Sequence, residues 1–278
     1  MKFLSRVIKG ITWFLALLII CTLIPPTRIG PSMLVMQLNN YVQNKNALTI
    51  KEGIKIKMPA GYVSDSQKWY PFVMTYDASH AFSRKIDRDV DLTILYNFAG
   101  YNPLKGRSRL YEHDSPYLGS FYGAYLLKNN DTAFAYLFND EGDIQVDALT
   151  SVARYDYLQL VLGGFGAPYA SLNFDVISNE FQSIDLKGER WTQVTSIVQT
   201  NSPRHPLKSF KMSYLQYGLP EGKEGDQFSK MTLYSRVLVR KIEQAKTTVA
   251  LYAMSTDEAF LDQMTKSLLL ETEIEYLK

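Results

Sequence analysis

The sequence predicts an α+β fold, in which an N-terminal membrane helix is followed by antiparallel β-meander modules that are each closed by a helix. Three observations predict it. Residues 11–24 are uncharged and apolar, short strand-like runs with turn signals between them follow from residue 54, and apolar residues with helical spacing come after the last run of each half. The short spacing between the runs favours antiparallel pairing over βαβ units.

The N-terminal segment has the pattern of an export signal. Lys2, Arg6 and Lys9 precede the apolar residues, which end at Pro25 and Pro26. A helix over residues 7–23 would be about 26 Å long, a little less than the roughly 30 Å hydrocarbon core of a bilayer. Because no A-x-A-like cleavage site follows, we expect an uncleaved signal anchor over residues 1–26. The basic residues predict a cytoplasmic N-terminus and an extracytoplasmic main domain, so the protein is expected in the cell membrane as a single-pass protein.

Composition excludes some classes of function. The net charge is +2 and the basic residues are scattered, so no nucleic-acid partner is expected. The single cysteine, Cys21, lies within the apolar segment, and the exported part therefore cannot form an intramolecular disulfide. A lipidated cysteine usually follows a small residue. Because Ile20 precedes Cys21, an ordinary thiol is favoured over a lipidated cysteine.

The first half begins with a spacer at residues 27–45, in which residues 32–45 have the spacing of a short amphipathic helix. Alternation of apolar residues with lysine predicts a half-buried strand at residues 54–58. Phe174, Ile177 and Phe181 recur at three or four residues and predict a closing helix over residues 172–184. Further strands are expected at residues 69–76, 90–98, 117–127, 132–138, 144–152 and 157–162.

The second half begins after the polar run 185–190, which contains a glycine and predicts a domain boundary. We therefore expect an α+β domain at 46–187 and a second, smaller α+β subdomain at 188–278. Thr256 is expected to cap a helix over residues 257–270. The shared order of strands and helix fits a tandem repeat or convergence equally well. Strands are expected at residues 191–200, 210–217, 231–242, 248–254 and 273–277, with a mobile loop at 218–227.

Two segments of the first half resemble the PsbP-like group of exported accessory domains. Residues 54–62 (IKIKMPAGY) are similar to the opening strand and proline-glycine turn of that group, and residues 174–183 (FDVISNEFQS) are similar to its closing helix. The resemblance covers about 140 residues. It implies a non-enzymatic assembly or binding subunit.

The sequence contains no recognisable catalytic, metal or cofactor motif. His80, His113 and His205 are far apart and form no zinc-binding pair. Residues 112–115 (EHDS) place a base, an acid and a nucleophile side by side, but Pro116 favours a plain turn. We therefore expect no catalytic residues, no metal ligands and no cofactor.

An acidic run also precedes one predicted strand. Asp87, Asp89 and Asp91 would share one face of an extended segment, where mutual repulsion could raise a pKa or attract a cation. The basic residues beside them favour an ordinary charged strand entrance. An envelope hydrolase acting around His113 or this run is the alternative reading.

Aromatic side chains are the best sign of a binding surface. Tyrosine offers a large contact area with a polar end, and in a sheet with one open face some of the aromatics must be exposed or covered by another layer. We predict that the protein contacts another envelope protein as a binding, accessory or immunity-type protein, with a sensor of a small envelope ligand as a further alternative. The expected contact residues are Trp69, Tyr70, Tyr117, Phe121, Tyr122 and Tyr125.

Overall fold

The protein is described from a computed structural model. The described residues are 2–23, 38, 41–42, 45–59, 62–64, 67–68, 74–98, 101–102, 107–108, 116–130, 135–162, 172–201 and 230–276. Its fold is α+β, with antiparallel sheets and a few helices, as the sequence predicts.

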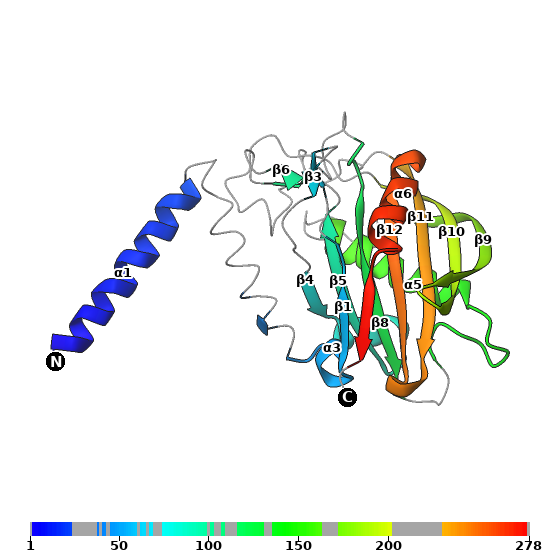
Figure 1. Cartoon of the computed structure of the whole chain (residues 1–278), viewed down its shortest axis with the longest axis horizontal. Helices are drawn as coiled ribbons and strands as arrows, with labels where there is room; N and C mark the ends of the chain where they lie inside the picture. The colour runs from blue at the N-terminus through cyan, green and yellow to red at the C-terminus, as the bar shows by residue number, and fades with distance from the viewer. Residues whose placement is uncertain are drawn as a thin grey trace.

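A seven-stranded antiparallel sheet forms the centre of the fold (Figure 1). Its strand order is β4-β5-β8-β12-β11-β10-β9, so that β8 pairs with β12 although more than a hundred residues separate them in sequence. The strands are β4 (Met74–Asp77), β5 (Val90–Phe98), β8 (Phe121–Asn129), β9 (Phe174–Leu186), β10 (Glu189–Asn201), β11 (Lys230–Ile242) and β12 (Thr247–Ser255).

Helices cover one face of the sheet, which we call the α5 face. They are α4 (Ser79–Ile86), α5 (Val146–Arg154) and the π-helix η3 (Tyr155–Leu162). Phe82 on α4 is fully buried, and its ring centroid lies 5.3 Å from that of Tyr155. These helices and alternate residues of the strands enclose one apolar core.

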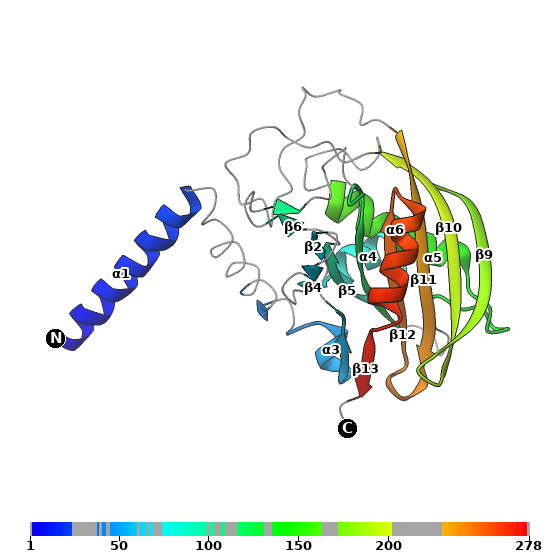
Figure 2. The same cartoon turned by 45° about the horizontal axis from the view of Figure 1, so that its top comes forward.

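A second layer covers the opposite face, which we call the α6 face (Figure 2). Trp191, Leu238 and Leu251 point from the sheet into this second core. The covering elements are α3 (Leu48–Lys51), α6 (Glu258–Met264), the π-helix η7 (Thr265–Leu269) and a ribbon formed by β1 (Ile54–Lys57) and β13 (Glu273–Tyr276). The remaining described elements are β2 (Tyr62–Ser64), β3 (Gln67–Lys68), β6 (Tyr101–Asn102), β7 (Arg107–Ser108) and η6 (Glu243–Ala245).

Three predicted elements have a different secondary structure, and the described part of the strand expected at 132–138 is a turn with one isolated β-bridge, Phe138 to Ile144. The strand expected at 144–152 is helix α5, because Leu149 and Val152 are buried at helical spacing. The strand expected at 157–162 belongs to η3. The helix expected over 172–184 is strand β9, which pairs with β10 along almost its whole length. The cap of the last helix is also different, since the side chain of Asp257, not that of Thr256, accepts a hydrogen bond from the Phe260 amide at 2.9 Å.

The boundary expected at 187/188 falls in a tight turn between two paired strands. Lys187 and Gly188 have φ angles of 55° and 79°, the pair of positive values that a two-residue type I′ hairpin requires. Leu186 faces Glu189 across this turn. Residues on both sides of the boundary therefore contribute strands to the same sheet.

The N-terminal helix α1 (Lys2–Leu23) includes an apolar stretch, Leu4–Cys21, that is long enough to cross a membrane. No part of that stretch is buried. Length and composition alone give weak evidence for a membrane span, because a signal sequence has the same pattern. Most of the helix expected at 32–45, the strand at 210–217 and the loop at 218–227 lie outside the described residues.

Candidate functional site

Four of the six predicted aromatic contact residues are buried. Tyr117, Tyr122 and Tyr125 are fully buried, and Phe121 is 2% exposed. Successive residues of β8 point to opposite faces, so that Phe121 and Tyr125 join the core of the α5 face while Tyr122 joins that of the α6 face. The aromatics are thus covered by two layers. The other two expected contact residues, Trp69 and Tyr70, lie outside the described residues.

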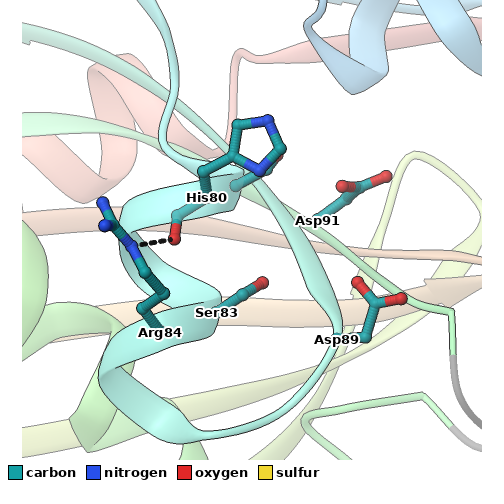
Figure 3. Close-up of a pocket in the computed structure, with 6 residues that line it drawn as sticks. His80, Ser83, Arg84, Asp89 and Asp91 are labelled. Carbon is teal, nitrogen blue, oxygen red and sulfur yellow. Dashed lines mark hydrogen bonds between the residues drawn. The ribbon is translucent and has the colours of Figure 1, made fainter.

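The acidic run lies where α4 ends and β5 begins. Asp87 closes α4 with a left-handed backbone, at φ 53°. Asp89 and Asp91 line a polar cleft of about 580 Å³ beside the helix (Figure 3). The other described lining residues are Ser79, His80, Ser83 and Arg84.

The polar groups of this cleft are already engaged with the protein. Ser79 Oγ donates a hydrogen bond to Asp77 at 2.6 Å, and Ser83 Oγ donates one to the Val90 carbonyl at 2.8 Å. Asp91 lies 4.0 Å from Lys51 Nζ. Within the described residues no three His, Cys, Asp or Glu side chains are placed to hold a metal ion. Among the described lining residues no nucleophile is hydrogen-bonded to a base, and His113 and residues 112–115 lie outside the described residues.

A carboxyl group is buried under the α5 face. Asp156, at the start of η3, is 2% exposed, and Tyr125 donates a hydrogen bond to its Oδ2 at 2.7 Å. The Tyr125 and Tyr252 rings stack with their centroids 4.2 Å apart. Burial raises the pKa of Asp156 to about 6, and the interactions of the two tyrosine hydroxyls with the carboxylate offset this only in part. Because the group is enclosed, it acts on the packing of η3 and not on an external ligand.

The edge strand β9 is the most unusual surface of the described chain. It is 13 residues long and pairs with β10 only, so its other edge has no partner strand among the described residues. Figures 1 and 2 both place it at the rim of the sheet, away from α4 and β5. From Ser178 to Leu186 its register with β10 is regular, and a β-bulge at Ile177 interrupts the pairing before that run.

Exposed apolar side chains gather at this edge. In the described residues from 45 to 276, apart from Ile50, the large apolar side chains that are exposed are Ile177 (58%), Phe181 (51%) and Ile197 (36%), on β9 and β10. We call these three residues the edge patch, in which Phe181 lies opposite Val194 on the α5 face and Ile197 lies on the α6 face. They are the functional candidates that sequence reasoning missed, because Ile177 and Phe181 were interpreted as the buried stripe of a helix.

Comparison with protein-family models, curated proteins and solved structures finds no match for the chain. One of the two motifs that carry the resemblance to PsbP-like domains is not present in the structure. Residues 174–183 form part of strand β9 and not a closing helix.

Proposed function

We propose that this protein is a membrane-tethered extracytoplasmic binding protein, without catalytic activity, that holds another envelope protein by pairing with the edge of strand β9. The observation that carries the proposal is the long edge strand with exposed apolar side chains. Natural sheets protect their edges with short strands, bulges, lysine, proline or covering segments, because an open edge is a template for another strand. Here the bulge leaves nine regular residues beyond it, from Ser178 to Leu186.

The backbone of this run is suited to strand addition. In the two-residue turn, the Leu186 carbonyl is directed toward Glu189 of β10, as the i to i+3 geometry of a β-turn requires. Backbone groups alternate in direction along a strand, so the outward-facing N–H and C=O groups belong to Asn179, Phe181, Ser183 and Asp185. An extended partner segment would satisfy them, as in β-augmentation.

The N-terminal helix supports the membrane part of the proposal. Its apolar window has a mean hydropathy of 1.8, Lys2 precedes it, and Arg6 and Lys9 lie within its N-terminal part. By the positive-inside rule this helix would keep its basic end in the cytoplasm and hold the folded body outside. A tethered body with one open sheet edge would then meet partners in, or attached to, the same membrane.

Site-specific photo-crosslinking in native membranes tests the proposal. A photoreactive residue replaces Gln182, which is exposed on β9, in the full-length protein, and a matched variant carries it at the exposed Asp143. We expect one adduct of defined mass from position 182 and none from position 143. Substitution Ser183→Pro removes an outward N–H and leaves the backbone hydrogen bonds to β10 intact, and among side-chain bonds it removes the exposed one that Arg190 Nε donates to Ser183 Oγ at 2.9 Å. It should therefore abolish the adduct while the thermal unfolding temperature changes little.

Two results would overturn the proposal. One is the absence of an adduct from position 182 in membranes that contain the protein at its natural level. The other is a set of adducts shared by both positions and insensitive to Ser183→Pro, since that pattern reports random collisions.

A further inference from the structure

The charges around the edge patch are arranged in a regular order on the α6 face. The β10 residues Thr195, Ile197 and Gln199 share that face, at alternate positions. On β9 they lie opposite Glu180, Ser178 and Asp175 respectively, with Ile177 as the extra residue of the bulge. An acidic side chain therefore stands on each side of an apolar centre formed by Ile177 and Ile197.

These two acidic side chains have no ion-pair partner in the part of the chain that the structure describes. Both Asp175 and Glu180 are exposed. The residues opposite them are Gln199 and Thr195. Arg236, on the strand beyond Thr195, is already bonded to Asp262 at 2.8 Å. As far as the described residues go, the edge thus presents two negative charges without an ion-pair partner beside exposed apolar surface.

We propose that β9 binds an extended segment of the partner protein with the pattern basic–x–apolar–x–basic, in which each basic residue is lysine or arginine. This inference rests on the proposed function, and it specifies the chemistry of the partner. Along a strand the side chains of one face repeat every second residue, and four residues span about 13 Å. The two basic side chains would then stand opposite Asp175 and Glu180 while the apolar residue between them covers Ile177. This part of the partner lies across the bulge, and its continuation pairs with the regular run from Ser178 to Leu186.

A second copy of β9 does not fit this edge. The strand contains Asp175, Glu180 and Asp185 but no lysine or arginine. Opposite charges on directly facing positions stabilise strand pairs, and like charges destabilise them. No register of β9 against itself pairs a base with an acid, so the charge pattern selects a different segment.

Peptide binding to the purified full-length protein in detergent micelles tests the inference. The probe is a fluorescein-labelled peptide, Gly-Ser-Lys-Thr-Val-Thr-Lys-Ser-Gly, and its affinity is measured by fluorescence anisotropy. Two control peptides replace both lysines by glutamate, or place the lysines side by side in Gly-Ser-Lys-Lys-Val-Thr-Thr-Ser-Gly. We expect the first peptide to bind about tenfold more tightly than either control, and to lose affinity as salt is added.

A charge exchange locates the binding on β9. The double substitution Asp175→Lys and Glu180→Lys should reverse the preference, so that the glutamate peptide binds more tightly than the lysine peptide. The matched control, Glu141→Lys with Asp143→Lys, adds the same charge on the exposed turn before α5 and should preserve the original preference.

Equal binding of the three peptides to the unmodified protein would overturn the inference, and so would a loss of preference in both charge variants. The first comparison needs no variant, so it remains decisive if the double substitution prevents folding. If position 182 crosslinks to a partner but the three peptides bind with equal affinity, only the inferred charge pattern of the partner segment is contradicted. The absence of such a partner would contradict the proposed function itself.

Discussion

Replacing the buried carboxyl by its neutral isostere should change how the stability of this protein depends on pH. Asp156 lies beneath the sheet with Tyr125 donating a hydrogen bond to it, and burial disfavours its ionised form. The substitution Asp156→Asn retains the shape and an oxygen that accepts the hydrogen bond of Tyr125. It removes the ability to ionise and replaces the second carboxyl oxygen by an NH2 group.

The magnitude follows from the pKa in the folded and unfolded states. Folding raises the pKa of Asp156 from 3.8 to about 6, so the folded protein binds the proton more tightly than the unfolded chain does. The free energy of unfolding therefore falls as the pH rises from about 4 to above 6, and stays lower at neutral pH. At about 1.4 kcal/mol for each pH unit of difference, the loss from this one group is about 3 kcal/mol.

Urea denaturation of the full-length protein in detergent, followed by tryptophan fluorescence between pH 4 and pH 8, checks this prediction. Other carboxyl groups also titrate in this range, so the measured quantity is the difference between the parent protein and Asp156→Asn. We expect the two to be similar near pH 4 and the variant to be more stable by about 3 kcal/mol near pH 7. Asp143→Asn, on an exposed turn, should follow the parent curve. If the curves of parent and Asp156→Asn ran parallel over this range, the reasoning about the buried carboxyl would be refuted.

Three further substitutions test the packing. Gly123→Ala should destabilise the protein by about 2 kcal/mol or more in urea titrations, because a Cβ there would lie 1.9 Å from the Leu95 carbonyl oxygen, whereas Gly10→Ala, with nothing within 4 Å, should not. Phe82→Ala should cost about 3 to 5 kcal/mol and raise amide exchange in α4, since this fully buried ring fixes the helix to the sheet. Lys57→Ala should leave the unfolding temperature unchanged in calorimetry, since its ion pair with Glu275 is exposed to solvent.

Strands with a local signal could be predicted from the sequence. The apolar β-branched run of β5 coincides with its predicted bounds, and the bounds of β10, β11 and β12 agree within one or two residues. The alternation of isoleucine and lysine in β1 also predicts its pairing surface, because the lysines face Glu273 and Glu275 of β13. These elements bury an alternating or continuous apolar pattern that needs no knowledge of distant residues.

Elements whose apolar residues fit two periodicities could not be predicted in this way. In α5, Val146, Leu149 and Val152 lie three residues apart, but the first and last of them also match an alternating pattern. The burial of the aromatic side chains could not be predicted either. Tyrosines such as Tyr117 and Tyr125 are suited to a core or to an interface. The choice depends on two covering layers that come from segments far away in sequence.

The misinterpreted strand β9 connects the failure of prediction with the proposed function. The spacing of Ile177 and Phe181 matches the buried stripe of a helix, yet both side chains are more than half exposed in the strand. Their apolar character is therefore not accounted for by the folding of the described residues. The residues at the two ends of β9, Phe174 and Leu186, are buried, and the strand pairs with β10 between them. Departures from local sequence rules concentrate at functional sites, and an apolar centre between two acids that have no ion-pair partner among the described residues is explained if a partner strand covers this edge.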